Sequence, residues 1–226
     1  MTRTVPPGSR RLLLALTLGT AVLVTGLLVA LSQLGAGHAG SPEELYAGIP
    51  QDGTTLGEAE APVTVSVYED FQCPFCGRFG REVLPDVVRE YVRSGEVRVE
   101  SRPMAFLGED SLEAARAALA AAEQDLYWQY HSLLFENQGA ENTGYVTDAL
   151  LERLARQTPG LDPGPWNDLR ASGSAGSELE DVRAEAGARG VDSTPTLIVS
   201  GPGGDEVLEG ARDFEEVAEA IEEARG

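Results

Sequence analysis

The 226-residue chain contains no lysine, so arginine supplies all 17 of its basic side chains. Asp and Glu total 37, and the formal net charge is −20. Proteins that bind nucleic acids neutralise phosphates with clustered Lys and Arg, and this chain has a large excess of the opposite charge. The composition therefore argues against a nucleic acid as partner.

Cysteine and histidine are also scarce, with two residues of each. Two cysteines cannot build the disulfide framework that stabilises many small secreted domains. A structural zinc site needs four ligands, and only His38 and His131 could join the two thiolates. Because His38 lies in a Gly-rich segment far from the cysteines, we expect no metal ion.

A long apolar run lies near the N-terminus. Residues 1–11 contain three arginines and no acid, and residues 12–34 carry no charge. As a helix this run would span about 35 Å, enough for the ~30 Å hydrocarbon core of a bilayer. The apolar part of a cleavable signal peptide is shorter, roughly 7–15 residues. The run therefore predicts a single transmembrane anchor, with a signal that is cleaved before secretion as the alternative.

The charges on either side of the run predict its orientation. The arginines precede it, and the first charges after it are Glu43 and Glu44. Positive residues stay in the cytoplasm, so residues 1–11 are expected inside the cell and the bulk of the chain outside, where disulfides form. Residues 35–57 are rich in Gly, Ser, Pro and Asp and are expected to be a linker before a folded domain at 58–226.

The hydrophobic pattern of the outer domain alternates between strands and helices. Residues 63–68 and 97–100 are predicted strands, and residues 74–93 are a predicted helix that Pro85 should kink. A strand, a helix and a strand in this order are typical of a parallel pair. Further helices are expected at 111–137 (capped by Ser111), 146–157, 163–171, 176–188 and 213–224, with strands at 195–199 and 206–209.

Both cysteines lie in the segment Cys73–Cys76, which reads CPFC and joins a predicted strand to a predicted helix. The free N–H groups and the positive dipole end of a helix N-terminus stabilise a thiolate. We expect Cys73 to be the nucleophile, with a pKa only modestly lowered because Phe75 adds no charge. Cys76, one turn on, would resolve the mixed disulfide. A structural disulfide stays open, although so small a loop constrains the unfolded chain little.

Two short motifs carry a family resemblance. The segment 70–76 reads DFQCPFC after a strand, and the segment 193–196 reads STPT before a late strand. Together with Arg102-Pro103 and Gly190-Val191, they resemble the DsbA-like group of thioredoxin-fold proteins. The resemblance covers residues 56–226 and implies an α/β thioredoxin fold with a helical insertion at about 108–189, which the N-terminal transmembrane helix would precede.

The resemblance also implies a substrate-binding site. It assigns Pro195 a cis peptide bond packed against the cysteine pair. The backbone of Thr194 would then pair with an extended substrate segment, and Pro74 and Phe75 would complete the binding surface. The alternative is an ordinary trans proline that opens a strand.

Two features depart from the family's pattern. Many thioredoxin-fold proteins place a buried acid six residues before the first cysteine, where this sequence has Val67. Glu69 and Asp70 follow, but strand alternation predicts that only one of them points inward. The dipeptide between the cysteines is Pro-Phe and not the Pro-His of strong oxidases, so the disulfide is expected to be less oxidising.

The aromatic segment 127–131 (YWQYH) allows two interpretations. Aromatic residues at helical spacing are typical of a core, and a substrate groove is the alternative. His131 is expected on the helix surface or as a capped core residue, and not as a catalyst. The acids at 213–223 are expected on a solvated helix face.

The leading hypothesis is a membrane-anchored thiol–disulfide oxidoreductase that oxidises cysteine pairs of client proteins outside the cytoplasm through Cys73 and Cys76. Such exchange needs no metal and no organic cofactor. The resemblance implies that a membrane protein similar to DsbB or to vitamin K epoxide reductase reoxidises it. A reductase or isomerase on the same fold, and a non-catalytic redox-sensing or binding module, stay open because a fold alone does not decide function.

Overall fold

The computed structural model describes residues 41–210 and 212–226. The predicted basic segment 1–11, the predicted anchor 12–34 and His38 lie outside the described residues. Within the part of the chain that is described, no helix combines the length and the hydropathy needed to cross a membrane.

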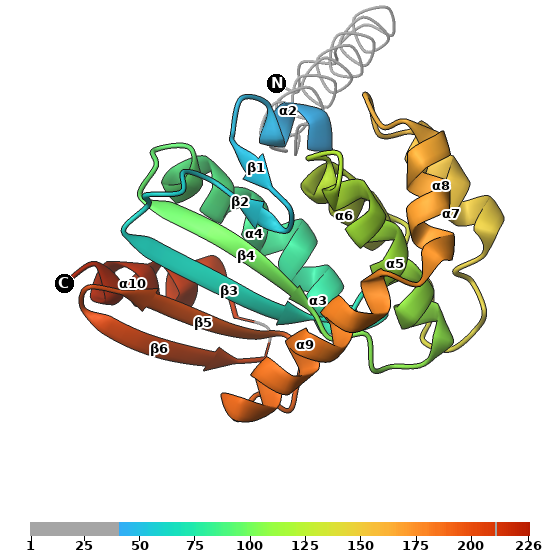
Figure 1. Cartoon of the computed structure of the whole chain (residues 1–226). Coiled ribbons are helices and arrows are strands. Elements are labelled where there is room, and N and C mark those ends of the chain that lie inside the picture. The colour runs from blue at the N-terminus through green and yellow to red at the C-terminus, as the bar shows by residue number, and fades with distance from the viewer. Residues whose placement is uncertain (1–40, 211) are drawn as a thin grey trace, which may run out of the picture. The chain divides into compact units, whose positions relative to one another are not determined.

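A six-stranded mixed sheet runs through the domain in the order β1-β2-β4-β3-β5-β6 (Figure 1). The strands are β1 (Gln51–Asp52), β2 (Thr55–Leu56), β3 (Val63–Glu69), β4 (Val97–Pro103), β5 (Thr196–Gly201) and β6 (Gly204–Glu209). β3 and β4 are parallel, as the order of elements predicts, and β5 lies antiparallel on the other side of β3. β3 is thus flanked by strands on both sides, and six of its seven residues are buried.

The segment after β3 forms a continuous helical stretch of changing pitch. It consists of α3 (Pro74–Arg78), the π-helix η1 (Phe79–Val83), α4 (Leu84–Val87) and the π-helix η2 (Val88–Val92). The predicted helix over 74–93 is therefore confirmed. Pro85 has no N–H to donate, and in a regular α-helix its ring would clash with the carbonyl of Arg81. The wider turn of η1, directly before it, accommodates this residue.

A block of five helices is inserted between β4 and β5. They are α5 (Glu109–Ala122), α6 (Tyr127–Glu136), α7 (Asp148–Arg156), α8 (Pro163–Ser172) and α9 (Ala175–Ala188). The predicted helical insertion is confirmed, but the single helix predicted over 111–137 is wrong. Asp125, between α5 and α6, has φ of 55°, which an α-helix cannot contain. Ser111 does not cap α5 either, because Gly108 holds that position and Ser111 is buried in the first turn.

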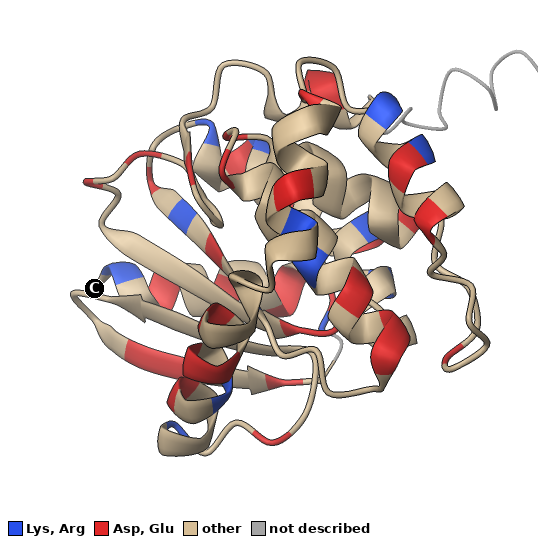
Figure 2. Cartoon of the chain, turned by 45° about the vertical axis from the view of Figure 1, so that its right-hand side comes forward, with Lys and Arg blue, Asp and Glu red and all other residues tan. Residues whose placement is uncertain are grey.

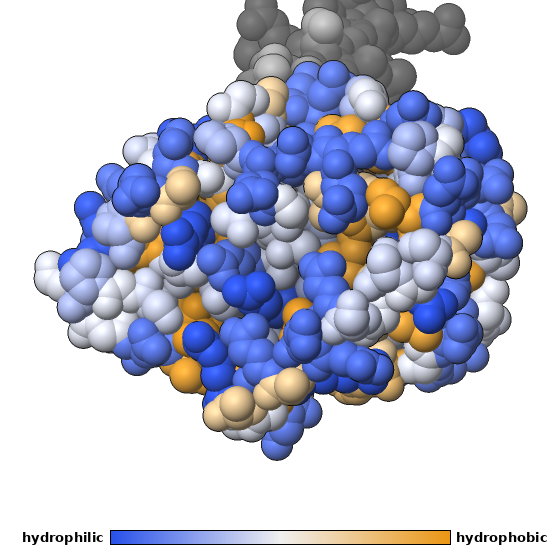
Figure 3. Space-filling model, in the orientation of Figure 1, coloured by the Kyte–Doolittle hydropathy of each residue, from blue (hydrophilic) through white to orange (hydrophobic). Residues whose placement is uncertain are grey.

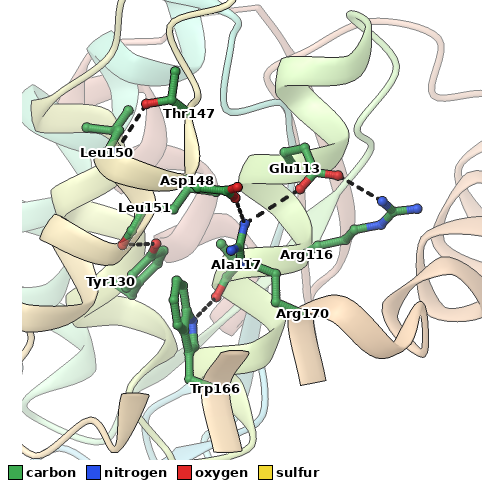
Figure 4. Close-up of polar contacts among 10 residues, drawn as sticks. All are labelled: Glu113, Arg116, Ala117, Tyr130, Thr147, Asp148, Leu150, Leu151, Trp166 and Arg170. Atoms are coloured by element: carbon green, nitrogen blue, oxygen red, sulfur yellow. Dashed lines mark hydrogen bonds and ion pairs between the residues drawn. The ribbon is translucent and has the colours of Figure 1, made fainter. Parts of the chain in front are cut away.

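Polar contacts tie the helices of the insertion together (Figure 4). The guanidinium of Arg170 on α8 lies 2.7 Å from the carboxylate of Asp148 on α7 and 3.8 Å from that of Glu113 on α5. The indole N–H of Trp166, also on α8, donates to the carbonyl of Ala117 on α5 at 2.8 Å. α8 is therefore attached to two neighbouring helices through its side chains.

The sheet is covered by helices on both faces. The last helix, α10 (Phe214–Arg225), is capped by Asp213 and packs with α4 against β3, β5 and β6. α9 covers another part of the sheet through a separate hydrophobic cluster of Tyr68, Met104, Val182, Ala186, Val191 and Ile198. The sheet is therefore the middle of three layers, with helices on either side of it (Figure 1).

Residues 41–57 belong to the folded domain and are not the expected linker. The helix α2 (Pro42–Tyr46) is capped by Ser41 and buries Leu45 and Tyr46. β2 pairs with β4 and so extends the sheet. The Gly- and Pro-rich composition of this segment reflects tight turns between very short elements, and the predicted domain start at residue 58 is wrong.

The surface of the domain is acidic and mostly hydrophilic. Figure 2 shows Asp and Glu positions spread over the strands and the helices. In the orientation of Figure 1, hydrophobic residues form only small separate patches (Figure 3). Within the described residues, the large hydrophobic side chains that stay exposed are Phe75, Phe106 and Val207.

Candidate active site

Cys73 and Cys76 lie where β3 gives way to α3. Cys73 is the N-cap residue of α3, and Cys76 is buried in its first turn. Both are free thiols. The strand places the pair at the edge of the sheet, and the helix turns its N–H groups toward Cys73.

Hydrogen-bond donors around Cys73 lower its pKa to about 6. The thiol of Cys76 contributes most, and the N–H groups of Cys76 and Phe75 and the hydroxyl of Thr194 add to it, while burial acts in the opposite direction. The pKa shift is larger than the modest one expected, because the expectation counted the helix N-terminus and the absence of charge at Phe75 but not the Cys76 thiol and Thr194. Neutral donors that converge on one sulfur stabilise the thiolate without any cationic neighbour.

The environment of Cys76 acts in the opposite sense. Burial raises the pKa of Cys76 well above its ordinary value, and the neighbouring Cys73 and the negative charge of Glu69 raise it further. The N–H of Asp70, which donates to the Cys76 sulfur at 3.5 Å, opposes them. At neutral pH the pair therefore combines a reactive thiolate at Cys73 with a protonated thiol at Cys76.

The structure brings the second predicted motif to the first. The carbonyl of Thr194 accepts a hydrogen bond from the thiol of Cys73 at 3.4 Å, and the Thr194–Pro195 peptide bond is cis. Pro195 is buried and Thr194 is half-buried. Pro74 and Phe75 lie on the exposed side of Cys73, with 59% of Phe75 accessible. All six predicted site residues thus belong to one site.

Asp70 is a structural anchor of the site that the sequence reasoning missed. Its buried carboxylate accepts from the Ser111 hydroxyl at 2.5 Å, from the N–H of Gln72 at 2.8 Å, and from the N–H groups of Phe106 and Leu107 at 2.9 and 3.1 Å. It therefore joins the segment before Cys73 to the loop after β4.

Glu69 is buried as well, so the expectation that only one of the two acids points inward is wrong. β3 ends at Glu69, and Asp70 begins a turn to which strand alternation no longer applies. Glu69 lies two residues after Val67 and so on the same face of β3. The buried acid that is absent at position 67 is therefore present at position 69, two residues further along the strand.

Glu69 is bonded to His131, which therefore lies in the core and not on the helix surface. The Nε2 atom of His131 lies 2.8 Å from Oε1 of Glu69, and both side chains are 1% exposed. Tyr127, Trp128 and Tyr130 are buried around the same helix, as the core interpretation predicts. Alternation along β3 and helical spacing in α6 gave no signal for a contact across 62 residues.

Within 41–210 and 212–226, no three His, Cys, Asp or Glu side chains lie close enough to hold a metal ion.

Comparison with known proteins fits this geometry. A family model described as thioredoxin matches residues 50–223. The chain belongs to the thioredoxin family. Disulfide bond formation protein D of Bacillus subtilis is 29% identical over 169 residues, which cover 74% of each chain.

Solved structures place the chain within a subgroup of the family. Oxidised BdbD from Bacillus subtilis matches with a TM-score of 0.69 and 29% identity, over 76% of this chain and 93% of that one. DsbA from Chlamydia trachomatis matches with a TM-score of 0.67 over 75% and 89%, at 24% identity, which shows the shared fold. The protein is a DsbA-like thiol–disulfide oxidoreductase, as the sequence motifs predicted.

Proposed function

We propose that this oxidoreductase introduces disulfides into cysteine-containing client proteins outside the cytoplasm. The observation that carries the proposal is the contrast between the two sulfurs, with the pKa of Cys73 lowered to about 6 and that of Cys76 raised. A stabilised thiolate stabilises the reduced enzyme, so its disulfide is more readily reduced and is the better oxidant. The name of the Bacillus subtilis relative, disulfide bond formation protein D, supports the same direction.

The reaction proceeds in two exchanges. A client thiolate attacks Cys73 of the Cys73–Cys76 disulfide, the bond between the cysteines breaks, and Cys76 receives the electron pair and a proton. A second client thiolate then attacks the client sulfur of the mixed disulfide. The client disulfide forms, and Cys73 leaves as a thiolate, which its low pKa makes a good leaving group.

The surroundings of Cys73 suit an extended client segment. The backbone of Thr194 lies beside the Cys73 sulfur and would pair with the client as an added strand, with Pro195 buried behind it. Pro74 and Phe75 offer exposed apolar surface next to the same sulfur. The binding role of these four residues is part of the proposal.

The proposal includes an anchor and an electron acceptor. The uncharged run at 12–34, with arginines before it and acids after it, supports a single membrane span with the catalytic domain outside. Each client disulfide leaves two electrons on the enzyme, so a membrane reoxidase resembling DsbB or vitamin K epoxide reductase is needed. Carbonate extraction of membranes should leave the protein in the pellet, and recovery of a soluble chain beginning near residue 41 would instead show a cleaved signal.

The direction of exchange is tested by the redox state of the cysteines in intact cells. Rapid acid quenching and alkylation should find Cys73 and Cys76 mainly as a disulfide. The purified domain should have a reduction potential closer to about −120 mV than to about −270 mV. A pair held as dithiol in cells, with a potential near the lower value, would make the protein a reductase.

A further inference from the structure

A chain of buried polar groups leads from the helical insertion to the end of β3. The hydroxyl of Tyr127 lies 2.6 Å from that of Ser101, Ser101 donates to Oε1 of Glu69 at 2.5 Å, and His131 lies 2.8 Å from the same oxygen. None of the four side chains is more than 1% exposed. Polar groups so deeply buried are costly unless they are satisfied, and none of these four side chains is accessible to a client.

The hydrogen bonds around Glu69 favour a negative charge on its carboxyl group. Two donors, the Ser101 hydroxyl and the Nε2 atom of His131, converge on one oxygen of Glu69. The other ring nitrogen of His131, Nδ1, is buried and has no hydrogen-bond partner within residues 41–210 and 212–226. A hydrogen on Nδ1 would be a buried donor without an acceptor, so the ring is assigned its hydrogen on Nε2, where it donates to Glu69. The hydrogens of His131 and Ser101 therefore both point at one buried oxygen of Glu69, an arrangement that stabilises negative charge on it.

The backbone next to this acid contacts Cys76. The peptide that joins Glu69 to Asp70 donates its N–H to the Cys76 sulfur at 3.5 Å. Negative charge at Glu69 is one of the causes that raise the pKa of Cys76, after burial and the influence of Cys73. The described titratable groups that face this acid are Cys76 from α3, Tyr127 and His131 from α6, and Tyr46 from α2.

We infer that His131 is a positioning residue for the exchange reaction. By bonding to Glu69 it keeps a negative charge next to Cys76, so that Cys76 stays a thiol while a client is attached to Cys73. A protonated Cys76 cannot attack the mixed disulfide and reverse the first exchange. The second client thiol then has time to complete the client disulfide.

The proton balance is complete without any further reactant. A client with two thiols gives up two protons and two electrons. The electrons reduce the Cys73–Cys76 bond, one proton remains on Cys76, and the other leaves to solvent because Cys73 stays a thiolate. The benefit to clients rests on the oxidising direction proposed above, whereas the effect of His131 on Cys76 does not.

The inference is tested by mixing the reduced protein with the disulfide reagent dithiobis(nitrobenzoate), without a client or cells. Cys73 displaces one thionitrobenzoate and forms a mixed disulfide, and Cys76 then displaces the second. The rate of the second release against pH reports the ionisation of Cys76. We expect Glu69→Gln and His131→Leu to lower the midpoint of this profile, with roughly tenfold faster second release below the parent's midpoint.

Matched variants separate positioning from packing. His131→Gln keeps an N–H donor and should retain the parent's profile. Tyr130→Phe on the same helix removes a buried hydrogen bond to the Leu151 carbonyl and should leave the midpoint unchanged. Should His131→Leu not fold, His131→Phe keeps a ring in the aromatic cluster without a donor.

Two results would overturn the inference. An unchanged midpoint in a folded His131→Leu or His131→Phe protein would reduce His131 to a packing residue. An unchanged midpoint in Glu69→Gln would remove the buried charge from the mechanism. Neither result bears on the direction of exchange, which the redox state of the cysteines in cells decides.

Discussion

The thiol of Cys73 lies 3.4 Å from the carbonyl oxygen of Thr194, although 121 residues separate them in the sequence. Sheet register produces this contact. β3 and β5 run antiparallel with Tyr68 opposite Thr196, so the end of β3 and the start of β5 meet at one edge of the sheet. The five-helix insertion between the two motifs leaves that register intact, and two distant tetrapeptides therefore form one site.

Replacing Thr194 by valine should raise the pKa of Cys73 from about 6. The substitution keeps the shape of the side chain and removes a hydroxyl that stabilises the thiolate. One hydrogen bond of this kind corresponds to about one pKa unit at most. The rate of Cys73 alkylation by iodoacetamide against pH measures the shift.

The matched control for Thr194→Val is Thr196→Val. The Thr196 hydroxyl donates to the Ser193 carbonyl, so its loss should leave the alkylation profile of Cys73 in place. An equal shift in both variants would trace the effect to a general loosening of the turn before β5.

Replacing Cys76 by alanine should trap mixed disulfides between Cys73 and client proteins. Without Cys76, the only escape from the mixed disulfide is a second client thiol. Cys73→Ala should trap nothing, because Cys76 is fully buried and its pKa is raised by burial. Non-reducing gels of cells expressing each variant measure the adducts, and adducts formed through Cys76 would reverse the assignment.

Local patterns predicted most of the site but not its support. The alternation of residues 63–68, the CPFC segment and the STPT segment each contain their own signal, so the strand, the reactive pair and the partner loop were identified. The bond between Glu69 and His131 depends on how α6 packs against β3, and no local pattern contains that information. The alternation rule failed for Glu69 and Asp70 because β3 ends at Glu69 and Asp70 lies in the turn beyond it.

The two errors in the predicted fold arose because local composition was a poor guide to the observed elements. Residues 109–136 are rich in alanine and other helix formers, and propensity alone favours one continuous helix there. Asp125 adopts a left-handed conformation in the turn between the two helices, and this turn lets α5 and α6 pack against each other. Residues 41–57 bury only a few side chains, chiefly Leu45, Tyr46 and Leu56, too few to outweigh a linker-like composition.

The stability of the reduced protein should depend on pH through Cys73. A thiol whose pKa falls from its ordinary 9.0 to about 6 on folding stabilises the native state fully above pH 9, and this contribution is lost as the pH falls through 6. The difference in denaturation midpoint between the reduced parent and Cys73→Ser should therefore grow from pH 6 to pH 8. A difference that is constant across this range would show that the thiolate is not stabilised by the fold.

Replacing Asp70 by alanine should destabilise the protein by about 3 kcal/mol or more. The change leaves four donors without their acceptor, three of them backbone N–H groups, and each buried unsatisfied donor costs about 1–3 kcal/mol. Ser111→Ala removes the hydroxyl that donates to Asp70 and leaves the three backbone donors bonded to the carboxylate. It should cost roughly 1 kcal/mol. Urea denaturation of the two variants measures the difference, and equal losses would mean that the loop after β4 does not depend on the Asp70 carboxylate.

Replacing Phe75 by histidine should make the disulfide more oxidising. Phe75 is 59% exposed, so the fold should tolerate the change, and an imidazolium at this position lies in the first turn of α3 next to Cys73. A cation near the thiolate lowers its pKa, although solvent around so exposed a position limits the shift to about one unit. One unit corresponds to a potential about 30 mV higher for a two-electron couple.

Equilibration with glutathione buffers measures the potential of the Phe75→His protein. The control is Phe75→Ser, which removes the ring without adding charge. A potential that rises equally in both variants would show that loss of the exposed ring, and not the cation, controls the oxidising power of the Cys73–Cys76 pair.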